Sequence, residues 1–438
     1  MRPLKTGARP RIEEDKMNRV KITYAFLSAL AVAIAMPLVA QAKDLGNGSD
    51  PDNDAPLAAL EKSAVPNPTD NLITPEKANL GMLLYFDTRM GGDASDSCAS
   101  CHNPKQGWAF SDPICRGYPG TVHWRNCQTT VNSAYLKKIF WHGSTTSLEA
   151  QVFSAALGAV SGNGERDVME SRLQHIPYYV KEFRKVFGSR QPKIQDFARA
   201  VAVFERNDLI DTQSPFDKYM RGDKKAMTAS AVRGMKVFNG KGNCIECHNG
   251  ALTTEEKYYN LGVPNPPEWD ESGLNQISYR FENYAKGVTE KLYRNTHTDL
   301  GLYFQDKEAS TKGLFKTPPV RYLSYTAPYM HNGAFFTLEE VVDFYNEGGG
   351  TNDPWGTKTK ILKPLGLNDK EKADLVAFLE ALSGPEVRKD LKKEPKLPEY
   401  APLPNTAYTV LAPNAKYPFY HHPDGSKAAF GPQIMARN

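Results

Sequence analysis

Cys98-Ala99-Ser100-Cys101-His102 is the stretch that decides the fold of this chain. The spacing C-x-x-C-H is the attachment signature of c-type haem, in which two thiols bind the porphyrin and the histidine ligates the iron. A second copy, Cys244-Ile245-Glu246-Cys247-His248, follows later in the sequence. Two chance matches are improbable in a chain with only six cysteines. We therefore predict two covalently bound c-type haems.

Zinc or thiol redox chemistry is the alternative interpretation of the two cysteine pairs. A zinc site needs further ligands at metal-binding spacing, and the two remaining cysteines, Cys115 and Cys127, do not offer that spacing. In an exported protein, cysteines outside haem motifs usually pair. We expect a Cys115–Cys127 disulfide, with two free buried thiols as the alternative.

The composition is typical of a globular protein with two or three domains. The chain has 438 residues, of which 40% are hydrophobic and 24% are charged. The formal net charge is only +4, and basic residues alternate with acidic ones. This balance argues against nucleic acid as a partner.

Residues 1–42 have the features of a secretory signal peptide, which begins at Met1 or at Met17. A basic segment precedes an apolar run over residues 24–40, and Ala40-Gln41-Ala42 is typical of a cleavage site. We expect cleavage after Ala42 and export to the periplasm, which agrees with c-type haem. A membrane anchor is the alternative for this apolar run.

The rest of the chain divides by composition and by the repeated motif. Residues 43–72 are rich in Asp, Asn, Pro and Ala, which predicts a flexible linker. Residues 73–222 and 223–384 each hold a predicted helix, a glycine-containing turn and one haem motif. Residues 385–438, rich in Pro, Lys and Tyr, predict an extended tail over the surface. We expect a mainly α fold with two cytochrome c-like domains, each with one covalently attached haem.

Helix signals are clearest around the two motifs. Thr74, followed by Pro75, is expected to cap the helix before the first motif. A second helix is expected to begin near Thr228. Apolar spacing predicts further helices within 147–203, where Pro177 interrupts the pattern, and at 337–347 and 368–382. Residues 249–318 show few periodic stretches, and we expect a long polar and aromatic loop region there.

Longer motifs resemble those of the bacterial dihaem cytochrome c peroxidase and MauG family, from about Gly81 to about Leu382. They are Leu84-Tyr85-Phe86-Asp87, Arg125-Asn126, Phe140-Trp141, Leu148-Glu149-Ala150-Gln151 and residues 315–321 and 326–333. The resemblance implies that His102 and His248 are the proximal ligands of two haems. Peroxide would react at the N-terminal haem, and the C-terminal haem would supply electrons.

The resemblance also implies roles for residues between the haems. Trp141 matches a tryptophan that assists electron transfer, although a buried core aromatic is the alternative. Gln151 matches a glutamine on the peroxide side. Asn126, Thr326 and Pro328 match positions that hold a calcium ion between the domains, and calcium accepts side-chain and backbone oxygens.

The sixth ligand of the C-terminal haem is expected at Tyr345, fourteen residues after His331. Typical peroxidases have methionine at this position, which raises the haem potential. A phenolate would instead stabilise oxidised iron, which is the MauG-type arrangement. Two alternatives remain open at this stage: Tyr345 only packs, or Met330 ligates the iron.

The distal side of the first haem departs from the family pattern. The family's catalytic glutamate falls on Ser161, and a shifted loop would bring Glu165 there as the general acid and base. His142 replaces a family aspartate and is a second candidate for the distal base. The family's mobile distal histidine falls on Tyr118, whereas the loop's histidine is His123. We expect an open first haem that reacts with peroxide without reductive activation.

The resemblance implies an exported dihaem oxidoreductase that reduces hydrogen peroxide with electrons from a small periplasmic cytochrome c or cupredoxin. One alternative is MauG-type oxidation of an aromatic side chain on a partner protein. A non-catalytic dihaem electron carrier is the other, because Ser161 stands in place of the expected glutamate. The resemblance also leaves room for a homodimer.

Overall fold

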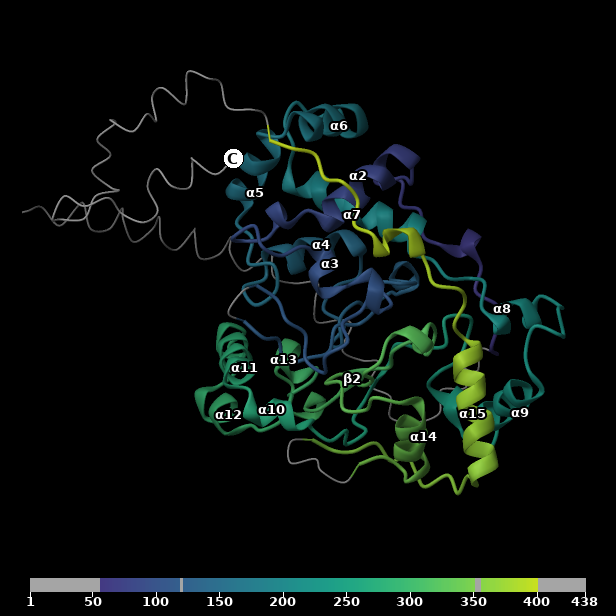
Figure 1. The fold of residues 1–438 in the computed structure, drawn as a ribbon. Helices are drawn as coiled ribbons and strands as arrows, with labels where there is room; N and C mark the ends of the chain where they lie inside the picture. The colour runs from purple at the N-terminus through teal and green to yellow at the C-terminus, as the bar shows by residue number, and fades with distance from the viewer. Residues whose placement is uncertain (1–55, 119–120, 351–355, 401–438) are drawn as a thin grey trace, which may run out of the picture.

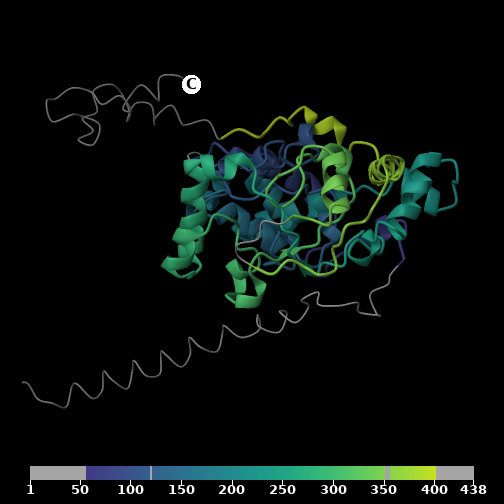
Figure 2. The ribbon, with the colours of Figure 1, turned by 90° about the horizontal axis from the view of Figure 1, so that it is seen from below.

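The computed structural model describes residues 56–118, 121–350 and 356–400. Over these residues the fold is mainly α-helical, as predicted (Figures 1 and 2). Strands β1 (Tyr258–Tyr259) and β2 (Phe315–Lys316) pair antiparallel in a two-stranded sheet. The predicted signal peptide, residues 43–55 of the predicted linker, and residues 401–438 of the predicted tail lie outside the described residues.

The helices follow one another along the chain with short 3-10 turns between them. The α-helices are α2 (Pro75–Phe86), α3 (Cys98–Cys101), α4 (Leu148–Leu157), α5 (Arg166–Gln174), α6 (Pro177–Phe187), α7 (Ile194–Asp208), α8 (Pro215–Met220), α9 (Ala229–Asn239), α10 (Pro267–Glu271), α11 (Gly273–Ala285), α12 (Glu290–Asn295), α13 (Tyr303–Asp306), α14 (Leu338–Asn346) and α15 (Asp369–Ala381). The 3-10 turns are η3 (Lys62–Ala64), η4 (Thr88–Met90), η5 (Pro104–Gln106), η6 (Ser133–Tyr135), η7 (Cys244–Glu246), η8 (Ala309–Thr311), η9 (Leu323–Tyr325) and η10 (Lys389–Lys392).

The two largest hydrophobic cores of the described residues lie one beside each haem motif. In the first, α2 packs against α7, and Leu84, Tyr85 and Phe204 are buried. In the second, α9 packs against α15 around Phe238 and Phe378. Each core therefore holds the helix that leads into its C-x-x-C-H motif.

Both helix pairs approach closely at one glycine. A Cβ on Gly81 would lie 1.9 Å from the carbonyl oxygen of Ala200, across the α2–α7 contact. A Cβ on Gly234 would lie 1.8 Å from the carbonyl oxygen of Asp374, across the α9–α15 contact. Because any larger residue would push the helix axes apart, both cores use glycine at the crossing point.

The helix signals around the motifs are confirmed. Thr74 accepts a hydrogen bond from the amide of Lys77 and caps α2, with Pro75 as its first residue. Thr228 caps α9 in the same way. Helices α14 and α15 lie where apolar spacing predicts them. Pro177 is the first residue of α6, where its missing N–H is harmless.

The described part of the predicted linker is ordered, which corrects that prediction for residues 56–72. Leu57 and Leu60 are buried, and Leu57 belongs to the second core. The amide of Leu60 donates to Asp217 over 2.8 Å. Composition alone is a poor guide here, because two leucines suffice to anchor a polar segment.

The expected loop region at 249–318 contains four helices, α10 to α13, so that expectation is wrong. In α11, the buried residues include Asn275, Ser278 and Asn283, whereas large apolar residues are exposed. The apolar residues of this helix do recur at helical spacing, but they lie on its exposed face instead of its buried one.

The chain after α15 returns to the first core, as the yellow end of the ribbon shows (Figure 1). Leu391, in η10, is buried in that core. The indole N–H of Trp108 donates to the carbonyl of Val387 over 3.0 Å. This segment ties the two halves together. The described helices include none with the length and apolar character needed to cross a bilayer.

Candidate functional site

A cavity of about 940 Å³ reaches both C-x-x-C-H motifs. Its wall includes the cysteines and the histidine of each motif. The cavity also contacts residues from both halves of the chain, including Trp141, His331 and Tyr345. A cavity of this size is at the upper end of the range for cofactor sites.

The histidines of the two motifs are held in the orientation that an iron ligand needs. The Nδ1 of His102 lies 2.9 Å from the carbonyl oxygen of Gln128, and the Nδ1 of His248 lies 3.3 Å from that of Thr253. A proton on Nδ1 satisfies each carbonyl and leaves Nε2 free to bind metal. Burial lowers the pKa of both imidazoles to about 4, so both are neutral, as a ligand must be.

The thiols fit covalent haem attachment. Cys98 and Cys101 begin and end the single turn of α3, and Cys244 begins the equivalent 3-10 turn η7, which Cys247 follows directly. One turn brings both sulfurs of a motif to the same side as the histidine that follows. All four are free thiols on the cavity wall. The donor set is therefore that of two c-type haem sites.

Trp141 connects the two halves at the cavity. Its indole N–H donates to the carbonyl of Asn126 over 2.9 Å, and its own carbonyl accepts from the amide of Lys316 over 2.9 Å. Its ring meets the ring of His331 edge-on, with centroids 6.4 Å apart. The indole is thus fixed between a loop of the first half and strand β2 of the second.

The three residues matched to a calcium site all line the cavity. Asn126 uses its amide nitrogen to donate to the carbonyls of Asp112 and Pro113, which directs its Oδ1 elsewhere. The backbone amide of Asn126 also donates to the carbonyl of His331 over 2.8 Å. The side-chain oxygen of Asn126 and the backbone oxygens of Thr326 and Pro328 are hard ligands of the kind that calcium prefers.

A buried ion pair next to the cavity escaped the sequence analysis. Arg125 pairs with Asp299 through both carboxylate oxygens, and the two side chains are almost completely buried. Burial alone would raise the pKa of Asp299, but the guanidinium holds it below its ordinary value. Asp299 lies in an aperiodic stretch, so no signal in one sequence marks it as buried.

His142 is the third member of this network. Its Nδ1 lies 2.5 Å from Nη1 of Arg125, so it accepts a hydrogen bond from the guanidinium. Burial, reinforced by the nearby Arg125 charge, lowers the pKa of His142 well below its ordinary value. His142 therefore lines the cavity as a neutral imidazole.

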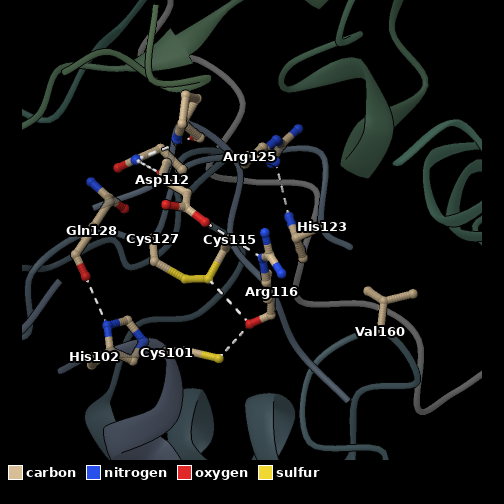
Figure 3. Close-up of a disulfide and its surroundings, with 12 residues drawn as sticks. Cys101, His102, Asp112, Cys115, Arg116, His123, Arg125, Cys127, Gln128 and Val160 are labelled. Carbon is tan, nitrogen blue, oxygen red and sulfur yellow. Dashed lines mark hydrogen bonds and ion pairs between the residues drawn. A yellow bond between two sulfur atoms is a disulfide. The ribbon is translucent and has the colours of Figure 1, made fainter. Parts of the chain in front are cut away.

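The loop after the first motif is closed by the predicted Cys115–Cys127 disulfide, which is confirmed (Figure 3). The sulfurs of this bridge lie within 4.8 Å of the Cys101 sulfur. Cys101 donates to the carbonyl of Arg116 over 2.7 Å. The bridge therefore lies directly beside the first attachment thiol.

His123 lies inside this closed loop. Its Nδ1 accepts from the amide of Arg125 over 3.1 Å, and its ring stacks on Trp124 with centroids 4.2 Å apart. Burial lowers its pKa to about 3, so it is neutral on the cavity wall. Tyr118 is tied to the neighbouring loop by a 2.6 Å bond from its amide to the carbonyl of Ser161.

The two peroxide-side candidates lie in different surroundings. Gln151, on α4, lines the cavity. Glu165 is exposed, and its carboxylate accepts from the amides of Asp167 and Val168 as the cap of α5. The loop shift that would bring Glu165 to the cavity is therefore not seen, because the helix cap holds this side chain outside.

Tyr345 and Met330 both line the cavity in the second half. Tyr345 lies on α14, and burial together with the nearby Cys247 and Cys244 raises the pKa of its hydroxyl. Tyr345 and the two cysteines of the second attachment motif line the same cavity. Met330 has a positive φ of 75°, a strained conformation for this residue type, in the loop before α14.

Known proteins are similar to this chain over most of its length. The family model of di-haem cytochrome c peroxidase matches residues 75–225. The cytochrome-c peroxidase IdrP1 of Denitromonas iodatirespirans is 49% identical over 376 residues, which are 85% of this chain and 97% of that protein. The methylamine utilization protein MauG of Methylorubrum extorquens is 33% identical over 334 residues, 74% of this chain and 85% of that protein.

Solved structures agree with the fold. A MauG-like protein associated with microbial copper homeostasis matches with a TM-score of 0.61 and 25% identity, over 77% of this chain and 97% of that chain. The diheme peroxidase BthA from Burkholderia thailandensis matches with a TM-score of 0.58 and 20% identity, over 75% of this chain and 90% of that chain. With two attachment motifs on one cavity and relatives along most of its length, this chain belongs to the di-haem cytochrome c peroxidase and MauG family of peroxidase-type oxidoreductases.

Proposed function

We propose that this chain is an exported dihaem peroxidase that reduces hydrogen peroxide at the haem bound by His102. His248 would hold the second haem, which would supply the electrons for that site. In this proposal, residues 73–222 and 223–384 are two cytochrome c-like domains, each with one covalently attached haem. When bound, the haems supply redox-active iron for peroxide and for electron storage.

The position of Trp141 carries the proposal. Its indole donates to the carbonyl of Asn126 and its backbone carbonyl accepts from the amide of Lys316, which fixes an aromatic group between the two halves. Both bonds go to backbone groups, so the ring position depends on the chain path rather than on mobile side chains. Such rigidity keeps the relay geometry constant.

On the peroxide side, the side chains that bind and orient the substrate are Gln151, His123 and His142. Both histidines are neutral and accept hydrogen bonds at Nδ1, so each carries its proton at Nε2. A wall of neutral N–H donors can orient peroxide without repelling it. Their low pKa values argue against proton uptake by either ring, so water in the cavity is the proposed proton carrier.

Calcium is part of the proposal as a structural ion. Asn126, Thr326 and Pro328 would hold it at the contact between the halves. Because Asn126 also accepts the Trp141 hydrogen bond, the ion would fix the loop that positions the indole. Calcium removal should therefore disturb electron relay before it disturbs the fold.

The external electron donor is proposed to be a small periplasmic cytochrome c or cupredoxin, after signal peptide cleavage behind Ala42. The higher identity to a named cytochrome-c peroxidase, 49% against 33% for MauG, favours peroxide reduction over oxidation of a protein substrate. The test is steady-state oxidation by peroxide of a reduced cytochrome c and, separately, of a reduced cupredoxin with the purified holoprotein. Turnover in proportion to enzyme concentration is expected, and a failure with both donor classes would contradict the proposal.

MauG-type oxidation of a partner's aromatic side chain is the second candidate function. The observation that favours it is Tyr345, which lines the cavity together with Cys244 and Cys247 and would stabilise oxidised iron as a ligand. One equivalent of peroxide added to the diferric protein separates the two functions. A long-lived oxidised spectrum, which Tyr345→Met shortens and Met330→Leu leaves unchanged, supports the MauG type. Rapid return to the resting spectrum with reduced donor supports the peroxidase.

A further inference from the structure

Ser161 occupies the position where the family pattern has its catalytic glutamate, and its hydroxyl donates to the carbonyl of Ala155 over 2.7 Å. Glu165 is held outside the cavity by the cap of α5. His123 and His142 are neutral rings whose pKa values burial lowers far below neutrality, so neither takes up a proton there. The proton transfer that splits peroxide therefore calls for another acid–base group on this wall.

The carboxyl side chains that line the cavity, among the described residues, are Asp96, Glu205, Glu282 and Asp299. Asp299 is bound through both oxygens to Arg125, and Glu205 accepts a hydrogen bond from a serine hydroxyl of η6. Asp96 belongs to the attachment loop, two residues before the first motif. In the described part of the chain, no hydrogen bond occupies the carboxylate of Glu282. Glu282 is thus the free carboxyl that the second half of the chain brings to the cavity.

Helix α11 places Glu282 on the wall of the first haem site. One face of the helix carries residues separated by four, three and four positions, namely Asn275, Tyr279, Glu282 and Lys286. Near the start of this face, Asn275 donates to the carbonyl of His123 over 2.8 Å. One turn later, the ring of Tyr279 meets the ring of Trp124 edge-on. The face that carries Glu282 is therefore packed against the loop of His123.

The end of the same face reaches the second histidine of the wall. The ammonium of Lys286 lies 5.9 Å from the centre of the Phe304 ring, and that ring meets the ring of His142 edge-on. Glu282 lies one turn before Lys286, between the contact with the His123 loop and the contact with Phe304. Both Glu282 and Lys286 line the cavity.

Burial also tunes Glu282 for proton transfer. It raises the pKa of the carboxyl above its ordinary value of 4.5, and the nearby charge of Lys286 opposes this shift without cancelling it. An acid–base group is most effective when its pKa approaches the working pH, because it can then both accept and return a proton.

We propose that Glu282 is the acid–base group for peroxide at the first haem site, in place of the glutamate that Ser161 replaces. This role rests on the proposed reduction of peroxide. The Glu282 carboxylate takes a proton from one peroxide oxygen through the cavity water and returns it to the other oxygen as the O–O bond breaks. That oxygen leaves as water, and the carboxylate is regenerated. The remaining oxygen leaves as a second water after two electrons from the donor and two protons from solvent are added.

The other charged or titratable groups that face this wall are Lys286 on α11, Lys307 after α13, the Arg125–Asp299 pair, His123 and His142. The histidines titrate at lower pH, and the guanidinium keeps the aspartate ionised. Below its own pKa, Glu282 is protonated and cannot accept the peroxide proton. The rate should therefore fall with falling pH through a value above 4.5.

The test is the rate at which the diferric holoprotein reacts with peroxide, measured by stopped flow across this pH range. Glu282→Gln should slow the reaction about a hundredfold or more and remove the fall at low pH. Glu282→Asp keeps a carboxyl and should stay within about tenfold of the wild type. Glu290→Gln, a change at an exposed carboxyl that pairs with Arg294 on α12, is the matched control and should leave the rate unchanged.

Cyanide gives a second measurement that involves no turnover. It arrives as hydrogen cyanide and binds haem iron as the anion, so its association needs a base on the same wall. Glu282→Gln should slow this association by a similar factor in the absorption spectrum of the first haem. A wild type that does not react with peroxide would contradict the proposed function and this role with it. A reactive wild type with an equally fast Glu282→Gln variant would overturn the role of Glu282 alone, as would a loss of rate confined to Asp96→Asn.

Discussion

The indole N–H of Trp141 donates to the backbone carbonyl of Asn126 over 2.9 Å, which joins the proposed electron relay to the proposed calcium site. The amide of Asn126 in turn donates to the carbonyl of His331, whose ring meets the same indole edge-on. Three positions that family motifs mark separately thus form one hydrogen-bonded unit. A substitution at any of these three residues should therefore shift the positions of the other two.

Trp141→Phe should slow electron transfer between the two haem sites about tenfold or more, because phenyl is harder to oxidise and loses the bond to Asn126. The measurement is the rate at which the half-reduced holoprotein consumes one equivalent of peroxide. Trp108→Phe is the matched control, since Trp108 also donates to a backbone carbonyl, that of Val387, but lies in the first core. Equal rates in both variants would contradict a relay role.

Glu165→Ala should lower the stability of the protein by about 1 kcal/mol, because α5 loses its capping carboxylate. The peroxide reaction rate should stay close to that of the wild type, since Glu165 is exposed. Gln151→Ala should slow the same reaction with little loss of stability. Stopped-flow mixing with peroxide and urea unfolding measure the two effects. A peroxide reaction abolished in a folded Glu165→Ala protein would restore Glu165 as the distal acid and base.

Local signals predict the scaffold around the motifs. The helices before each C-x-x-C-H are marked by the Thr74 and Thr228 caps and by apolar spacing, because each helix buries one apolar face in one core. The disulfide also follows from cysteine count and export. These features are encoded by near neighbours in the chain, so one sequence is enough to find them.

Contacts between distant segments escape sequence reasoning. Asp299 is held at the cavity only because Arg125, 174 residues earlier in the sequence, pairs with its carboxylate. Helix α11 carries apolar residues at helical spacing, but it exposes them and buries the amides of Asn275 and Asn283, so its buried face does not follow from the pattern. The position of Glu165 in the sequence suggests a distal acid, but its carboxylate caps the N-terminus of α5 instead.

Cys127→Ser should reduce haem attachment at the first motif severalfold. The freed Cys115 thiol would lie beside Cys101, and an export oxidant could join these two sulfurs before the porphyrin reaches them. The double variant Cys115→Ser/Cys127→Ser should attach haem normally. Both variants lose the loop constraint, worth about 3 kcal/mol, so their difference isolates the free thiol. The mass of the peptide that contains Cys101 gives the haem occupancy, and equal occupancy in the two variants would contradict the prediction.

Glu205 should make the protein less stable as the pH rises. Burial raises the pKa of this carboxyl from 4.5 to about 8 in the folded state, despite a hydrogen bond from Ser133. Between these values the unfolded chain loses a proton that the folded protein keeps, so stability is full below pH 4.5 and falls towards pH 8. The slope from this one group approaches about 1.4 kcal/mol per pH unit.

Glu205→Gln removes this slope, so wild type and variant should diverge in urea unfolding between about pH 5 and pH 8. Glu170→Gln is the control, because the partner Lys193 lowers the Glu170 pKa and both states are already ionised in this window. Parallel curves for wild type and Glu205→Gln would show that the carboxyl is ionised in the folded protein.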